Sequence, residues 1–247
     1  MKVVFPNSFE SAYQLSCKQN HVLFSGGTYI LTENKLSQLI LVDINKLLNS
    51  TTEKTLAQTK IGARTTLQEI IDFERIANPE SKLIQSIKYS CPSKNLRNQR
   101  TIGGEVARNI SNSEILAFLH AVNAQLTIVT DKHNQISIRK WDGVGIVKEI
   151  IFSNERANTV AIQRYSVIPS APAIVIVAGT GNKESIEIAI GGKIDSILNF
   201  SLQQTDIDSI VTIANVASAS FKADDYGTQA YKKSLITTAI KRIKETL

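Results

Sequence analysis

The hydrophobic pattern changes near Glu149, and this change constrains the fold more than any other feature of the sequence. Four β-rich runs come after it, and two segments with the spacing of amphipathic helices come after them. Strands followed by helices are typical of an α+β domain. We therefore expect a smaller C-terminal α+β domain over residues 149–247, with a three- to four-stranded sheet plus helices. The expected strands are 150–153, 159–167, 173–178 and 185–190, with a turn at 179–182, and the expected helices lie near 206–217 and 229–246.

Residues 1–148 are expected to form a larger N-terminal domain, in two subdomains of about 1–52 and 53–148. In the first, three short apolar strands surround a helix that Ser8 can cap, which makes a small α/β unit. A polar stretch from Asn49 to Lys54 marks the division. The expected strands of this unit are 2–5, 21–24 and 39–42.

The second subdomain is expected to mix strands and helices. Thr66 begins a helix, and Glu69, three residues on, completes a capping box. Cys91-Pro92-Ser93 ends another helix. The expected elements are paired strands over 55–64, helices over 83–89 and 113–122, and strands over 125–130 and 135–139 joined by a turn at 131–134.

Composition excludes several classes of function. No run of about 18 apolar residues occurs, so no helix is expected to span a membrane. The two cysteines, Cys17 and Cys91, are far apart and the three histidines lack metal-ligand spacing, so we expect no iron–sulfur cluster or zinc held by this chain alone. Low cysteine use fits the reducing cytoplasm, where we expect the protein to be located. The net charge of +6 is compatible with a nucleic acid, an anionic cofactor or an acidic partner.

Two segments carry paired glycines. The first is Leu23-Phe24-Ser25-Gly26-Gly27-Thr28-Tyr29-Ile30, and the second is Asn95-Leu96-Arg97-Asn98-Gln99-Arg100-Thr101-Ile102-Gly103-Gly104-Glu105. Paired glycines can take positive φ and let consecutive backbone N–H groups surround an anion, so two facing segments could hold a pyrophosphate from both sides. Thr28 and Thr101 add hydroxyl donors. Each pair alone is more often a plain turn, and neither segment has Rossmann or P-loop spacing.

Together these segments resemble a known family, the FAD-binding medium subunits of molybdenum hydroxylases of the xanthine dehydrogenase and carbon monoxide dehydrogenase type. Ser25-Gly26-Gly27-Thr28 resembles the family's first FAD loop, usually Ala-Gly-Gly-Thr, and Arg97-Asn98-x-x-Thr101-Ile102-Gly103-Gly104 resembles the second. Residues 61–67 and Tyr231-Lys232-Lys233 are similar to further family segments, so the resemblance covers nearly the whole chain. It implies a two-subdomain FAD-binding domain of the PCMH/vanillyl-alcohol-oxidase type, followed by the smaller α+β C-terminal domain.

The resemblance also implies cofactor contacts. Ser113 and Glu114 fall where the family usually has Ser/Ala-Asp, which anchors the flavin, and Gln163 or Arg164 falls near a polar or basic residue that faces the isoalloxazine. Glu105 stands where Asn or Asp is commoner, and its side chain is expected to turn away because a carboxylate repels pyrophosphate. No acid–base dyad, nucleophile or metal ligand is expected. The other positions assigned to FAD are Phe24, Ser25, Gly26, Gly27, Thr28, Tyr29, Ile30, Thr101, Ile102, Gly103 and Gly104.

The implied partners are a molybdopterin-binding large subunit and a small subunit with [2Fe–2S] clusters. This chain would be a flavoprotein oxidoreductase subunit that takes electrons from the clusters and passes them to NAD or another acceptor, with activity only in the complex. The family's four-cysteine insertion and fused molybdenum or ferredoxin domains are missing from these residues, so those centres are expected on other chains. Exposed basic residues near Arg97 and Arg100 are expected to contribute to electron flow across the interface.

Two other functions are considered. A free-standing small flavin oxidoreductase is disfavoured because 247 residues leave little room for a substrate domain and a catalytic base. A basic nucleic-acid-binding protein ranks lower, because Trp141 is the only tryptophan and no aromatic–basic interleaving occurs.

Overall fold

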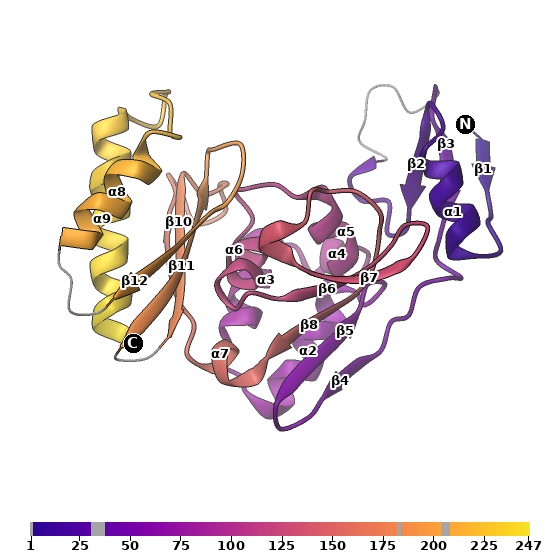
Figure 1. Ribbon diagram of the computed structural model, residues 1–247, viewed down its shortest axis with the longest axis horizontal. Coiled ribbons are helices and arrows are strands. Elements are labelled where there is room, and N and C mark those ends of the chain that lie inside the picture. Colours follow the sequence, from indigo (N-terminus) through magenta and orange to yellow (C-terminus); the bar gives the residue numbers. More distant parts are fainter. Residues whose placement is uncertain (1, 31–37, 182–183, 204–207) are drawn as a thin grey trace.

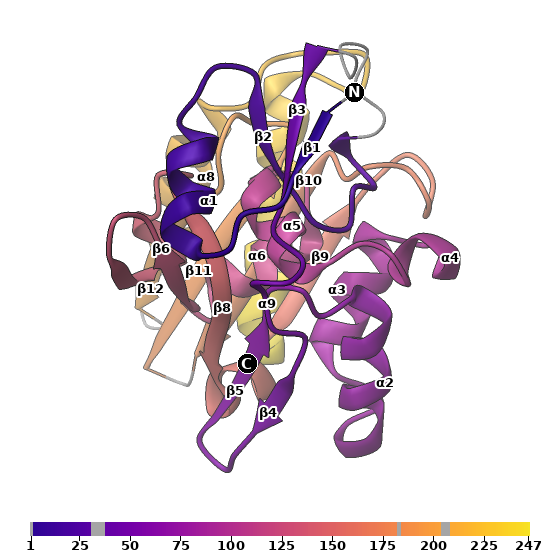
Figure 2. The same ribbon diagram turned by 90° about the vertical axis from the view of Figure 1, so that its right-hand side faces the viewer.

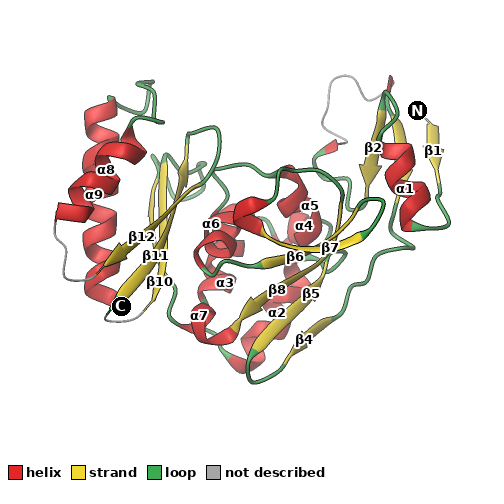
Figure 3. Ribbon diagram, viewed as in Figure 1, coloured by secondary structure: helices red, strands yellow, loops and turns green. Residues whose placement is uncertain are grey.

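The computed structural model describes residues 2–30, 38–181, 184–203 and 208–247. Its elements form three groups in a row, with the N-terminal group at one end, the C-terminal group at the other and the largest group between them (Figure 1). Each group contains both helices and strands (Figure 3). The expected α+β fold class is therefore confirmed.

The N-terminal group is a small parallel sheet with one helix. Its elements are β1 (Lys2–Val4), α1 (Phe9–Ser16), β2 (His21–Phe24) and β3 (Ile40–Asp43). The strands pair in the order β1-β3-β2, all parallel. Ser8 caps α1 by accepting a hydrogen bond from the backbone N–H of Ser11 at 3.1 Å. This is the α/β unit that the sequence predicts.

The central group is built on a five-stranded sheet. Its elements are β4 (Thr52–Lys54), β5 (Gln58–Gly62), α2 (Leu67–Ala77), α3 (Lys82–Ser90), α4 (Lys94–Arg97), α5 (Ile102–Arg108), α6 (Glu114–Ala121), β6 (Gln125–Val129), β7 (His133–Ser137), β8 (Ile146–Ser153) and α7 (Asn154–Asn158). The sheet is antiparallel throughout, in the order β4-β5-β8-β6-β7. The capping box predicted for α2 is present, with Glu69 accepting a hydrogen bond from the N–H of Thr66 at 2.8 Å and donating its own N–H to the Thr66 hydroxyl at 3.2 Å.

The expected domain boundary between residues 148 and 149 falls inside β8. This strand is the middle of the five-stranded sheet, where Ile150 pairs with Ile61 on one side and with Leu126 on the other. The strand therefore belongs to the central group, and the boundary drawn from the sequence is misplaced. The long-range pairing of β8 has no local signal, because its apolar run reads the same in either sheet.

The C-terminal group is a four-stranded antiparallel sheet with two helices. Its elements are β9 (Ala161–Tyr165), β10 (Val175–Gly181), β11 (Ser185–Gly192), β12 (Leu198–Gln203), α8 (Asp208–Ser218) and α9 (Gln229–Thr246). The strand order is β12-β11-β10-β9. Strand β12 was not expected from the sequence, although Leu198, Phe200 and Leu202 alternate as a strand requires. Of the turn expected at 179–182, residues 179–181 belong to β10, and Asn182 lies outside the described residues.

Helix α6 joins the two larger groups. It packs against β10 and β11, while α8 and α9 cover the other face of that sheet (Figure 1). All eight residues of α6 are buried, which explains why it is apolar around most of its circumference. Phe118 of α6 meets Phe152 of β8 edge to face, with ring centroids 5.8 Å apart. Among the described helices, none combines the length and the apolar character that a bilayer crossing requires.

Candidate functional site

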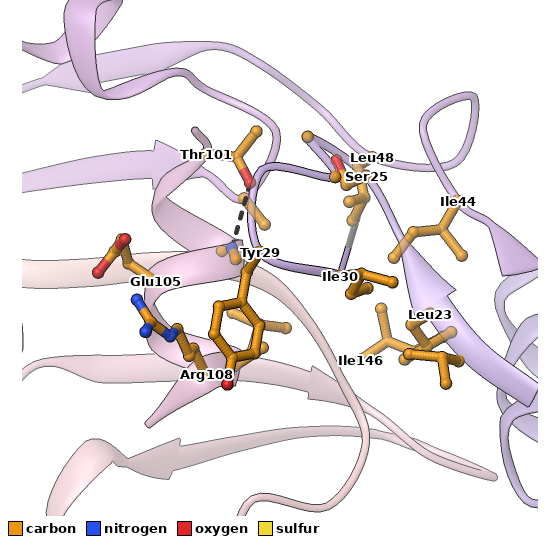
Figure 4. Close-up of a pocket in the computed structure, with 18 of the residues that line it drawn as sticks. Leu23, Ser25, Tyr29, Ile30, Ile44, Leu48, Thr101, Glu105, Arg108 and Ile146 are labelled. Carbon is orange, nitrogen blue, oxygen red and sulfur yellow. Dashed lines mark hydrogen bonds between the residues drawn. The ribbon is translucent and has the colours of Figure 1, made fainter. Parts of the chain in front are cut away.

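A cavity of about 560 Å³ lies between the N-terminal group and helix α5. The N-terminal sheet is seen in front of α5 in Figure 2, and the side chains around the cavity are shown in Figure 4. Its volume is in the range of small-molecule sites. The lining includes the predicted residues Ser25, Gly26, Gly27, Thr28, Tyr29, Ile30, Thr101, Gly103 and Gly104.

The first glycine segment is an open turn at the end of β2. Two hydrogen bonds fix Ser25 to Asn45, whose Oδ1 accepts from the serine hydroxyl at 2.9 Å and whose Nδ2 donates to the serine carbonyl at 3.4 Å. Gly27 has φ of 71°, which a residue with a Cβ rarely adopts. Within the described residues, the backbone N–H groups of Gly26, Gly27 and Thr28 make no hydrogen bond. They are therefore available to an anion, as the sequence predicts.

The second glycine segment is the first turn of α5, with Thr101 as the N-cap. The N–H of Ile102 donates to the Thr65 carbonyl at 3.0 Å and that of Gly103 to the Ala63 carbonyl at 2.9 Å. The N–H of Gly104 donates to the Thr101 hydroxyl at 3.2 Å. The expected loop of free N–H groups is therefore wrong here, because a capped helix and a neighbouring strand end already use them.

The two glycines of the second segment have different surroundings. A Cβ on Gly103 would lie 2.6 Å from the Cβ of Ala63, so this glycine permits close packing of α5 on the end of β5. A Cβ on Gly104 would meet only the Thr101 hydroxyl, at 3.0 Å, and Gly104 is exposed toward the cavity. The missing side chain of Gly104 thus leaves space in the cavity, whereas that of Gly103 allows α5 to pack closely against Ala63.

The two glycine segments touch, as the sequence analysis predicts. A Cβ built on Gly26 would lie 2.3 Å from the carbonyl oxygen of Gln99 and 3.5 Å from the Cγ2 of Thr101. This close approach brings the turn after β2 against the start of α5 and closes one side of the cavity.

One wall of the cavity is charged. Glu105 is 3% exposed and forms an ion pair with Arg100 at 3.2 Å. Burial raises the pKa of the Glu105 carboxyl above its ordinary value, and the Arg100 and Arg108 guanidiniums oppose that rise. Glu105 is among the residues that line the cavity, next to Arg108 (Figure 4), and the expectation that its side chain turns away from the pyrophosphate stays a prediction. The arginines explain how a carboxylate can remain there.

The opposite wall is apolar and includes Leu23, Ile44 and Ile146 (Figure 4). Gly143 and Gly145, which the sequence analysis missed, also line the cavity and have φ of 89° and 98°. Two glycines separated by one residue, just after Trp141, were the signal for this loop. An aromatic ring system could lie against such a wall.

The structure does not bring the other predicted residues to this cavity. Ser113 caps α6, and Glu114, 2% exposed, forms a buried ion pair with Arg164 and accepts a hydrogen bond from Ser90 at 2.9 Å. Gln163 lies beside Arg164 on β9 and is half-buried. Phe24 ends β2 and Ile102 is fully buried, so both flank the cavity without lining it. The flavin contacts expected of these residues stay predictions.

Arg97 is a structural residue. It is buried, and its guanidinium donates to the side chain of Gln68 at 3.0 Å and to the carbonyls of Cys91 and Pro92 at 2.8 and 2.7 Å. Arg100 is half-buried and paired with Glu105, so neither arginine is exposed. The contribution of exposed basic residues near them to electron flow stays a prediction.

The cavity and the N–H groups beside it, which are unpaired within the described residues, suit an anionic cofactor, and the sequence match to a known family identifies the class of protein. Residues 1–142 match the family described as the FAD binding domain in molybdopterin dehydrogenase. This match covers more than half of the chain, so the chain belongs to that family, and its cofactor is FAD. No curated protein matches the sequence.

Solved structures share the fold over the whole chain. Carbon monoxide dehydrogenase from Hydrogenophaga pseudoflava aligns with a TM-score of 0.77 at 18% identity, covering 99% of this chain and 97% of that chain. Quinoline 2-oxidoreductase from Pseudomonas putida 86 aligns with a TM-score of 0.75 at 16% identity, covering 99% and 95%. CO dehydrogenase from Oligotropha carboxidovorans aligns with a TM-score of 0.75 at 15% identity, covering 100% and 98%.

The residues of the cavity fit FAD. The open N–H groups of residues 26–28 suit a pyrophosphate, and the missing side chain of Gly104 leaves room for it. The apolar wall suits one of the two ring systems. The chain is thus an FAD-binding member of an oxidoreductase family, and the cavity is the candidate cofactor site.

Proposed function

We propose that this chain is the electron-transfer FAD subunit of a multi-subunit molybdenum hydroxylase. The observation that carries the proposal is the cavity between the two glycine segments, in a chain whose family is defined by FAD binding. The resemblance to xanthine dehydrogenase and carbon monoxide dehydrogenase medium subunits supports the more specific assignment.

The chain's own residues bind, orient and shield the cofactor. The N–H groups of Gly26, Gly27 and Thr28 hold the pyrophosphate, and Gly104 lets it approach α5 closely. Leu23 and Ile146 exclude water from a ring of the cofactor. FAD, when bound, supplies the redox chemistry, since a flavin can accept electrons singly and release them in pairs.

The proposed partners are a molybdopterin-binding large subunit and a [2Fe–2S] small subunit. The two cysteines, one exposed and one buried, cannot provide the four thiolates of a cluster, so the electrons must arrive from another centre. The similar structures are those of CO dehydrogenases and a quinoline oxidoreductase, and one of these CO dehydrogenases is described as lacking the Mo-pyranopterin moiety of its molybdenum cofactor. NAD or another carrier is the proposed acceptor, and the cytoplasm the proposed location.

The proposal is tested by comparing the single chain with the protein purified from its source under native conditions. The single chain should bind one FAD, and dithionite should bleach its flavin absorbance. It should oxidise no purine, quinoline or other heterocycle. The native preparation should contain molybdenum and iron in addition to FAD, measured by elemental analysis. Turnover of such a substrate by the single chain would instead support the free-standing flavin oxidoreductase.

A further inference from the structure

The charged wall of the cavity contains one positive charge in excess. Among the described residues that line the cavity, the formally charged side chains are Arg100, Glu105 and Arg108. Glu105 is paired with Arg100 at 3.2 Å, so these two charges largely offset each other. Arg108 has no ion-pair partner within 4.0 Å in the described chain. The positive charge of Arg108 is therefore available to an anion that enters the cavity.

Arg108 is held in place without being fully hydrogen-bonded. Its guanidinium carbon lies 4.0 Å from the centroid of the Tyr29 ring, a cation–π contact (Figure 4). Its Nε is buried and has no hydrogen-bond partner in the described structure. A buried donor without an acceptor is unfavourable, so the protein alone does not satisfy this side chain. A phosphate oxygen in the cavity is an acceptor of the right charge.

The buried carboxylate of Glu105 opposes anion binding in the cavity, and the positive charge of Arg108 offsets it. A pyrophosphate placed in this cavity brings negative charge next to a buried carboxylate, and the two repel each other. With Arg108, the three charged side chains sum to +1, and without it they sum to zero.

We propose that Arg108, oriented by the ring of Tyr29, is the residue that allows a cavity containing a buried carboxylate to accept the pyrophosphate of FAD. The inference rests on the proposed role of the cavity as the FAD site. In it, Arg108 donates to a phosphate oxygen and offsets Glu105, so Arg108 contacts the cofactor and takes no part in electron transfer.

Arg108 also has a structural role in α5, and the experiment must distinguish that role from the proposed phosphate contact. It lies in the last turn of α5, where a cation stabilises the helix end. Loss of that effect would change folding, whereas loss of a phosphate contact changes only the binding of phosphate-containing ligands.

The experiment is a calorimetric titration of the deflavinated full chain with three ligands. FAD carries the flavin, pyrophosphate and adenine, ADP lacks the flavin, and riboflavin lacks phosphate. The variants are Arg108→Gln, Arg108→Lys and the double variant Arg108→Gln/Glu105→Gln. The matched control is Arg242→Gln, which removes the same charge from the exposed side of α9, in the group at the other end of the molecule (Figure 1).

Arg108→Gln should weaken FAD and ADP binding by about tenfold to a hundredfold and leave riboflavin binding unchanged, since one charged hydrogen bond is lost. Arg108→Lys keeps the charge and should stay within about fivefold of the wild type. The double variant should recover about tenfold for FAD, because the repelling carboxylate has also been removed. Arg242→Gln should match the wild type for all three ligands.

Wild-type affinity of Arg108→Gln for FAD would overturn the inference while leaving the FAD site intact. Weakened riboflavin binding, equal to the loss for FAD, would also overturn it, because the contact would then be with the flavin. A wild-type chain that binds no FAD would contradict the proposed function itself.

Discussion

The two glycine pairs line one cavity, but their backbone N–H groups are in opposite states. Those of Gly26 and Gly27 make no hydrogen bond within the described residues, whereas those of Gly103 and Gly104 donate to the Ala63 carbonyl and the Thr101 hydroxyl. The first pair is a turn with a positive φ at Gly27, and the second begins a capped helix. Similar dipeptides can therefore serve anion binding in one place and close packing in the other, depending on whether a helix begins at the pair.

The largest expected effect is a loss of folding stability when Gly103 is replaced. Gly103→Ala places a methyl group 2.6 Å from the Ala63 Cβ, so either α5 or the end of β5 must move. Overpacking of this kind should lower the free energy of unfolding by about 1–3 kcal/mol. Urea unfolding of the FAD-free protein measures this loss, with Gly104→Ala as the control that should stay close to wild type. Equal losses for the two variants would show that the glycines do not differ.

The second expected effect concerns Gly104, where affinity should change and the fold should not. Gly104→Val puts a branched side chain into the space next to α5 that the cavity leaves open. We expect FAD to bind at least about tenfold more weakly, which corresponds to about 1.4 kcal/mol. Fluorescence titration measures the affinity, and circular dichroism checks that the helices remain. Full FAD occupancy in this variant would remove Gly104 from the cofactor site.

Local patterns in the sequence predicted most elements and the facing of the two glycine segments. The capping box at Thr66, the helix after Ser113 and the turn around Gly27 each depend on residues within a few positions of one another. The state of Gly103 in the second pair depends on the carbonyl of Ala63, forty residues earlier in the chain. No local pattern reports such a contact.

Long-range pairing also explains why the sequence misplaced the domain boundary and did not predict the ion pair of Glu114. The position of β8 at the centre of its sheet is set by β5 and β6, so the sequence placed a boundary inside it. Glu114 is bound to Arg164, fifty residues later, which a single sequence does not reveal. Arg100 and Glu105 are five residues apart, which is not a helical pairing distance, and Arg100 precedes the N-cap of α5, so no helical signal in the sequence indicates their ion pair.

The two threonines next to the glycine pairs, Thr28 and Thr101, are expected to differ in the same way as the glycines, one affecting FAD binding and the other stability. Thr101 caps α5, so Thr101→Val should cost about 1 kcal/mol of stability. Thr28 caps no helix in the described part of the chain, so Thr28→Val should leave unfolding unchanged and weaken FAD binding about threefold through the loss of a hydroxyl donor. Chemical unfolding and FAD titration of both variants provide the measurement. A loss of stability in Thr28→Val would place its hydroxyl in the fold instead.

The smallest expected effect is a dependence of FAD affinity on pH at the second segment. Burial raises the pKa of Glu105 above 4.5, while Arg100 and Arg108 lower it and Glu114 adds to the rise. A bound pyrophosphate favours the protonated carboxyl further, so binding takes up a proton and affinity falls as pH rises through the pKa of Glu105. We expect this fall in affinity at pH values above the ordinary pKa of a glutamate, and Glu105→Gln should abolish it. An unchanged pH profile in Glu105→Gln would assign the dependence to another group.

The difference between the backbone N–H groups of the two glycine pairs can be measured directly by amide hydrogen exchange. NMR follows the exchange residue by residue with and without FAD. We expect fast exchange at Gly26, Gly27 and Thr28 in the FAD-free protein and marked protection once FAD is bound. The amides of residues 102–104 should be protected in both states, because the protein already supplies their acceptors. Slow exchange at residues 26–28 without FAD, or protection of residues 102–104 that appears only with FAD, would contradict this difference between the two pairs.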